Sequence, residues 1–144
     1  MKESLAYLNN DFVPLSRCRL AIYDLGVVLG AAVTDFLRTF HGKPYRMKDH
    51  VDRFYRSCRY ARIDCPKSPE ETMRISEELI ARNAEPGREL GLVYYITAGE
   101  NALYAGAAGV TSERRPTYVQ HTFPLPFGLW KRIFTEGVHC VTPA

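Results

Sequence analysis

The chain has 144 residues, 46% of them hydrophobic and 24% charged, which is typical of a folded protein with one domain or one domain and a piece of another. Its net charge of +3 is too mild for a nucleic-acid surface and suits an anionic small molecule better. No apolar run is long enough to cross a bilayer, and the N-terminal residues show no signal peptide. We therefore expect a cytoplasmic protein without a nucleic-acid or membrane partner.

The four cysteines favour free thiols over a zinc site. They form no CxxC pair and lack a histidine-rich partner motif; they are Cys18, Cys58, Cys65 and Cys140. Free thiols are usual in a reducing compartment. We therefore expect no metal ligands in this chain.

Two hairpins are predicted in the first third of the chain. The apolar runs 5–8 and 12–15 flank the turn-forming triplet Asn9-Asn10-Asp11. A second apolar-rich run, 33–40, is broken by His41-Gly42-Lys43-Pro44 and is expected to return through Tyr45.

The stretch 23–38 joins these hairpins and has the features of a turn, a loop and a strand. Asp24-Leu25-Gly26 predicts a turn, because Asp can bond its own backbone and Gly accepts a positive φ. Gly30-Ala31-Ala32 has little side-chain bulk, so another backbone or a ligand could approach closely there.

Two helices follow, over residues 47–62 and 69–85. In the first, an apolar stripe at helical spacing runs beside a second stripe that carries His50, Arg53 and Ser57. The second helix begins with a capping box from Ser68 to Glu71 and ends at Pro86-Gly87.

The rest of the chain predicts two more strands and then an unfinished segment. Residues 92–97 are a continuous apolar run, typical of a strand covered on both faces, and 117–123 form another strand. Residues 98–109 are rich in small side chains and predict a loop. The expected fold is α+β, with a mainly antiparallel sheet of about five or six strands and two helices packed on one side.

Two domains are expected: residues 1–123 as a small α+β domain, and 124–144 as a linker and the start of an incomplete second domain. Pro124 and Pro126 predict the linker. An unfinished domain would leave the apolar side chains after it poorly covered, and we therefore expect an oligomer. These side chains are Trp130, Ile133, Phe134 and Val138.

Several motifs occur together and in order along nearly the whole chain. They are Tyr7-Leu8-Asn9-Asn10-Asp11-Phe12-Val13, Asp24-x-Gly26 with Gly30, Val33 and Asp35, Leu37-Arg38-Thr39-Phe40 with Gly42-Lys43-Pro44, and His50-Val51-Asp52-Arg53-Phe54-Tyr55-Arg56-Ser57. In this order they resemble the N-terminal domain of class IV (fold type IV) pyridoxal-phosphate aminotransferases. That family includes branched-chain aminotransferases, D-amino-acid transaminases and aminodeoxychorismate lyases.

The resemblance implies pyridoxal 5'-phosphate as cofactor of the complete protein and Arg53 as the ligand of its phosphate. A guanidinium group suits this role because it makes bidentate, charge-assisted bonds to phosphate oxygens. Thr34 stands where the family often has an aromatic residue, which implies a substrate-binding position with a reshaped pocket. Tyr94 is a second candidate for that pocket, with a buried core tyrosine as the alternative. The family's glutamate is replaced by Asp35.

The resemblance also implies that catalytic residues are absent from this chain. The family's Schiff-base lysine and its acid at the pyridine nitrogen belong to the C-terminal domain, and none of the five lysines here has that context, Lys131 included. We therefore expect no transamination by these residues alone.

The expected function is that of an aminotransferase acting on a branched-chain or similar L-amino acid and a 2-oxo acid, within a homodimer or larger homo-oligomer. The alternatives are a D-amino-acid transaminase, an aminodeoxychorismate lyase-like enzyme, and a non-catalytic anion-binding or assembly module on the same scaffold. A nucleic-acid binder is disfavoured because the basic residues are dispersed along the chain.

Overall fold

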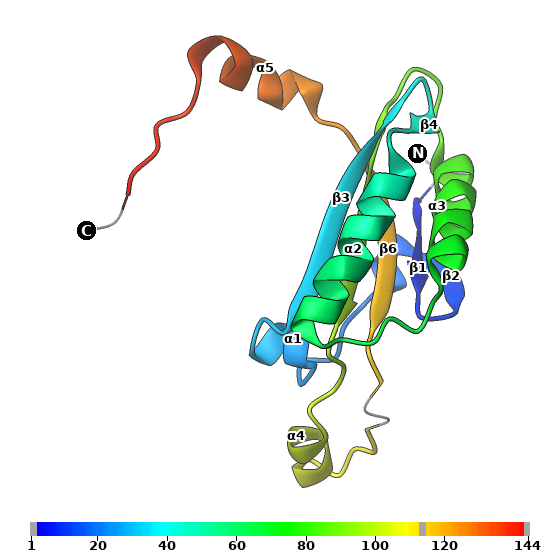
Figure 1. Ribbon diagram of the computed structural model, residues 1–144, viewed down its shortest axis with the longest axis vertical. Helices are drawn as coiled ribbons and strands as arrows, with labels where there is room; N and C mark the ends of the chain where they lie inside the picture. Colours follow the sequence, from blue (N-terminus) through cyan, green and yellow to red (C-terminus); the bar gives the residue numbers. More distant parts are fainter. Residues whose placement is uncertain (1–2, 113–114, 143–144) are drawn as a thin grey trace.

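A six-stranded antiparallel sheet is the centre of the computed structural model, which describes residues 3–112 and 115–142. The strands lie in the order β2-β1-β6-β5-β3-β4, and the two long helices, α2 and α3, cover one face (Figure 1). This confirms the predicted α+β fold. The strands are β1 (Leu5–Leu8), β2 (Asp11–Pro14), β3 (Ala32–Phe40), β4 (Lys43–Pro44), β5 (Leu90–Thr97) and β6 (Tyr118–Pro124). The helices are α1 (Leu25–Val28), α2 (Met47–Ala61), α3 (Pro69–Asn83), α4 (Ala102–Ala107) and α5 (Phe127–Glu136), with a 3-10 turn at Leu15–Arg17.

Both predicted hairpins are present. Strands β1 and β2 form an antiparallel pair that starts with Leu8 opposite Asp11 at the turn. Strands β3 and β4 also pair antiparallel, and His41 and Gly42 form the turn between them. These two turn residues have φ angles of 50° and 72°, the left-handed conformation that a tight hairpin turn requires. The Glu89 carboxylate accepts a hydrogen bond from the His41 backbone N–H at 2.6 Å, which ties the turn to the start of β5.

Helices α2 and α3 begin and end close to their predicted limits. Helix α2 buries Val51, Phe54 and Cys58 against the sheet, as its apolar stripe predicts. The capping box of α3 is formed in both directions between Ser68 and Glu71. The core therefore lies between these two helices and the sheet.

The two faces of the sheet differ because side chains alternate along each strand. On β3, Val33, Asp35, Leu37 and Thr39 point towards the helices and are buried, whereas Thr34 lies on the other face. This second face is only partly covered: Val93 and Tyr95 of β5 retain some exposure there. The sequence predicted β5 as covered on both faces, and the coverage of the second face is incomplete.

The turn at Asp24 is a short helix rather than a simple loop. Asp24 caps α1 by accepting a hydrogen bond from the Gly26 N–H at 2.7 Å. Gly26 is packed so tightly that an added Cβ would overlap the side chain of Thr97. At Gly30, by contrast, a Cβ would meet no neighbouring atom within 4 Å. Glycine is favoured there because the backbone has a φ of +68°. The close approach predicted near Gly30 therefore occurs at Gly26.

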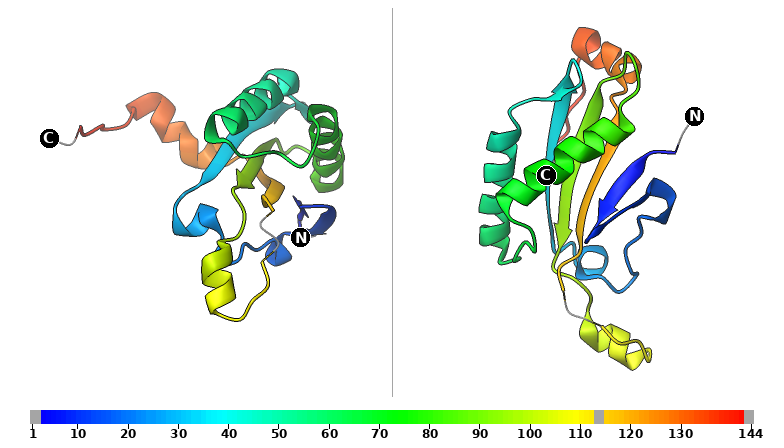
Figure 2. Two further views of the ribbon diagram at one scale, coloured as in Figure 1. Left: turned by 60° about the horizontal axis from the view of Figure 1, so that its bottom comes forward. Right: turned by 90° about the vertical axis from the view of Figure 1, so that its right-hand side faces the viewer.

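The segment after β5 differs from the predicted loop. Residues 98–109 contain α4, whose N-terminus is capped by the Asn101 side chain. Helix α5 follows the proline pair and projects away from the sheet (Figures 1 and 2). Ile133, Phe134 and Val138 are exposed, as expected, while Trp130 is partly buried. None of the helices in the described ranges is long and apolar enough to cross a membrane.

Candidate functional site

Three polar side chains meet between α2 and β3. The Asp35 carboxylate receives two hydrogen bonds from Arg53, from Nε to Oδ2 at 2.6 Å and from Nη2 to Oδ1 at 2.8 Å. His50 Nδ1 lies 2.8 Å from Asp35 Oδ1. The Asp35 side chain is only 2% exposed, whereas that of Arg53 is 54% exposed. The cluster therefore links a buried anion to a cation at the surface.

The local structure explains why these residues meet. Asp35 shares the helix-facing side of β3 with Val33 and Leu37, so the strand's alternation buries it beneath α2. His50 and Arg53 are three residues apart on α2 and project from one side of the helix. A buried carboxylate requires cationic or hydrogen-bonding partners, and α2 supplies both.

Electrostatics keep Asp35 ionised. Burial alone would raise the pKa of Asp35, but hydrogen bonds from Arg53 and His50 outweigh it and hold the pKa below its usual value. The same bond to Asp35 raises the pKa of Arg53. Because a carboxylate can only accept, His50 Nδ1 donates its proton to Asp35 and cannot also accept one from Arg53 Nη2, which is 3.2 Å away.

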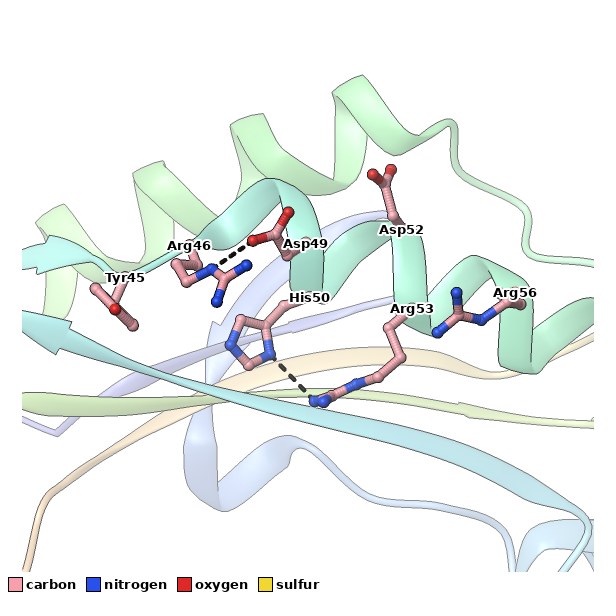
Figure 3. Close-up of a pocket in the computed structure, with 7 residues that line it drawn as sticks. All are labelled: Tyr45, Arg46, Asp49, His50, Asp52, Arg53 and Arg56. Atoms are coloured by element: carbon pink, nitrogen blue, oxygen red, sulfur yellow. Dashed lines mark hydrogen bonds and ion pairs between the residues drawn. The ribbon is translucent and has the colours of Figure 1, made fainter.

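A surface hollow of about 510 Å³ opens beside this cluster, and we call it the α2 hollow (Figure 3). Its lining comes from α2, as far as Arg56, and from the two residues before the helix: Tyr45, Arg46, Asp49, His50, Asp52, Arg53 and Arg56. Most of these side chains are polar or charged. The hollow therefore suits a small, charged group more than an apolar one.

The sequence-predicted site residues are not brought together in one cavity. Arg53 lines the α2 hollow, whereas Thr34 lies on the opposite face of the sheet and its Oγ1 donates to the Tyr94 carbonyl at 3.0 Å. Tyr94 is fully buried, and its hydroxyl lies within hydrogen-bond distance of Ser76 Oγ, at 3.3 Å. Burial raises the pKa of Tyr94 to about 12. The buried position of Tyr94 agrees with the alternative interpretation, that it is a core tyrosine. The substrate-binding roles of Thr34 and Tyr94 stay predictions.

The sequence assigned no role to two further residues, Asp35 and Tyr95. Asp35 was noted only as an acid in place of glutamate, and its contact with Arg53 was not predicted. Tyr95 pairs directly with Thr34 across β3 and β5, so it shares the more open face of the sheet with Thr34. The alternation of side chains along the two strands could have predicted the position of Tyr95. Because Tyr94 pairs with the inward-facing Asp35, the next residue, Tyr95, faces the other side of the sheet.

A second hollow, of about 550 Å³, lies on that more open face and is mainly apolar. It is bordered by β5, β6 and the segment after β2: Leu15, Cys18, Leu20, Val93, Tyr95, Val119, His121, Thr122 and Phe123. Burial lowers the pKa of His121 in its wall. We call it the open-face hollow.

Replacing Asp35 by Asn should change how stability depends on pH. A depressed pKa means that Asp35 contributes stability above its unfolded pKa of about 3.9, and that this contribution is lost as pH falls through the folded pKa. We expect D35N to be less stable than the unmodified chain by about 1–2 kcal/mol at pH 7. Urea unfolding should show a smaller difference at pH 3. The exposed Asp64→Asn is the control, and an equal D35N deficit at both pH values would contradict the assignment.

Comparison with known proteins gives the family. The model of the family "Amino-transferase class IV" matches residues 32–136, and the chain belongs to this family. Class IV aminotransferases are pyridoxal-phosphate enzymes.

Two curated relatives illustrate the similarity. The chain is 29% identical over 116 residues to the D-alanine aminotransferase of Staphylococcus aureus (strain N315), an alignment that covers 81% of this chain and 40% of the relative. It is 28% identical over 136 residues to the "Putative branched-chain-amino-acid aminotransferase" of Methanocaldococcus jannaschii, covering 94% of this chain and 44% of the relative. The chain thus spans about two fifths of the length of these relatives.

Solved structures confirm the fold. The branched-chain aminotransferase of Thermoproteus uzoniensis with norvaline superposes with a TM-score of 0.72 at 16% identity, covering 86% of this chain and 41% of that one. An aminotransferase from Brucella abortus bound to the cofactor PLP gives a TM-score of 0.70 at 17% identity, covering 87% and 43%.

Proposed function

We propose that this chain is the part of a pyridoxal-phosphate aminotransferase that binds the cofactor's phosphate through Arg53. The complete enzyme would move an amino group between an amino acid and a 2-oxo acid. The proposal rests on one observation. Two hydrogen bonds to Asp35 fix the guanidinium of Arg53, and the Arg53 side chain is exposed at the α2 hollow.

The remaining donors of Arg53 fit a phosphate group. A guanidinium has five N–H donors, and Asp35 takes Nε–H and one of the two on Nη2. The Nη1 donors have no partner among the described residues, and they are the ones available to an anion. Because Asp35 fixes the plane of the guanidinium, little side-chain entropy would be lost on binding. When bound, the cofactor supplies the electron-withdrawing ring that transamination needs.

For the substrate, we propose a branched-chain or similar L-amino acid. The similarity to the Methanocaldococcus jannaschii relative supports this class. A D-amino acid is the second candidate, because the relatives from Staphylococcus are named D-alanine aminotransferases. Assays of the complete enzyme with 2-oxoglutarate should give a higher kcat/KM for leucine than for D-alanine, and the reverse order would favour the second candidate.

We further propose that residues 1–123 and 124–144 belong to different domains. The complete protein would be a cytoplasmic homodimer or larger homo-oligomer, in which Phe134 and Val138 are covered. Their exposure in α5 and just after it supports this arrangement. Light scattering of the complete protein tests it, and a monomeric mass at all concentrations would contradict it.

The 144 residues alone should not transaminate. Among the described residues no lysine lines the α2 hollow, and Lys48, on the same helix, is paired with Asp52 at 2.6 Å. We expect no turnover above background in a coupled assay with pyridoxal 5'-phosphate, leucine and 2-oxoglutarate. Turnover that Lys131→Ala abolishes would overturn this expectation.

A further inference from the structure

The charges around the α2 hollow are paired, with one exception. Arg46 Nε contacts Asp49 Oδ2 at 2.5 Å, and Arg53 is paired with Asp35. The remaining acid of the lining, Asp52, is 2.6 Å from the Lys48 ammonium. Each of these pairs cancels its own charge, so none of them provides a net positive field for an anion.

Arg56 is the exception. It makes no hydrogen bond or ion pair with any residue within 3–112 and 115–142. Asp52, four residues earlier on α2, is the carboxylate best placed to neutralise it, but that carboxylate is bonded to Lys48. Figure 3 shows the Arg56 side chain extending along the helix in the direction of Arg53. The uncompensated charge of the hollow is therefore that of Arg56.

We propose that Arg56 is a second phosphate-binding residue, which supplies the net charge while Arg53 supplies the fixed donors. This inference rests on the proposed phosphate site at Arg53. A phosphate monoester carries a charge of about −1.5 to −2 at pH 7, and the guanidinium of Arg53 is already offset by the buried carboxylate of Asp35. A single neutralised cation is a weak match for such a group. Arg56 faces the same hollow and completes the charge balance.

The test is a titration of the 144-residue chain followed by the ³¹P NMR signal of 4-deoxypyridoxine 5'-phosphate. This cofactor analogue has no aldehyde, so it does not react with surface lysines. Inorganic phosphate is the second probe. We expect Arg56→Ala to weaken binding of both by about 3- to 10-fold, less than the loss of Arg53, because the exposed charge of Arg56 is screened by solvent. Arg56→Lys should recover part of this loss.

A matched control is available on the same helix. The Arg59 side chain is also exposed and forms no hydrogen bond or ion pair with the described residues. It does not line the α2 hollow, so Arg59→Ala should leave binding unchanged. A second variant, Asp35→Asn with Arg53→Gln, tests the proposed site without leaving a buried charge unpaired. Circular dichroism checks that each variant is folded.

The outcomes separate the inference from the proposed function. If the double variant weakens binding and Arg56→Ala behaves like Arg59→Ala, the role of Arg56 is overturned and the site at Arg53 stands. If Arg59→Ala weakens binding as much as Arg56→Ala, the attraction is diffuse and the inference is also overturned. If the double variant binds like the unmodified chain, the proposed function fails and the shared site fails with it.

Discussion

Arg53→Ala should weaken binding of 4-deoxypyridoxine 5'-phosphate by about 10-fold or more, because it removes at least one charge-assisted hydrogen bond to the phosphate. The same change should lower the free energy of unfolding by about 2 kcal/mol, because it leaves Asp35 buried with His50 as its remaining partner. That value is below the roughly 3–5 kcal/mol of a fully buried pair, since the half-exposed Arg53 is screened by solvent. Urea unfolding and the ³¹P titration measure the two effects.

The two effects of Arg53 can be separated. In the variant with Asp35→Asn and Arg53→Gln, no charge is stranded in the interior, so most of the lost stability should return. Phosphate affinity should not return with it. Recovery of binding together with stability would show that Arg53 acts only on the fold.

Phe54→Ala should be the most destabilising of these substitutions, at about 3–5 kcal/mol. Phe54 is fully buried next to Arg53 on α2, and its ring centroid lies 5.6 Å from that of Tyr94 and 6.4 Å from that of Tyr118. Its removal leaves a cavity where α2 is anchored to the sheet. Phosphate binding should therefore also fall, because the helix that carries Arg53 loses its position.

An exposed aromatic residue on the same helix provides the control. Tyr60 is 84% exposed, and Tyr60→Ala should change the free energy of unfolding by about 0.5 kcal/mol or less. Thermal or urea unfolding distinguishes the two variants. Equal losses would mean that α2 does not depend on Phe54 for its anchorage.

The helices and hairpins were predictable because their signals are local. The capping box at Ser68, the positive-φ turn at Gly42 and the helical spacing of the α2 stripe each depend on a few neighbouring residues. Helix α4 was missed for the opposite reason. Six residues that include a glycine are too short for a periodic pattern, and the helix depends on its Asn101 cap.

The site was predicted only in part. The position of Arg53 on an exposed helix side followed from its spacing to His50, but its partner Asp35 is 18 residues away in another element. Strand alternation would have placed Asp35 on the buried side with Val33 and Leu37, where an acid requires a cation. The same alternation separates Tyr94 from Thr34. Neither the helical spacing of α2 nor the strand alternation predicts which face of the sheet α2 covers, because that depends on the packing of the whole sheet.

The most direct test of the account is a crystal structure of the chain with 4-deoxypyridoxine 5'-phosphate. We expect the phosphate in the α2 hollow, with oxygens within about 3 Å of the free nitrogens of Arg53 and with Arg56 turned towards it. The bidentate contact between Arg53 and Asp35 should remain. A phosphate bound elsewhere, with Arg53 contacting only Asp35 and His50, would contradict the assignment of Arg53 as the phosphate ligand.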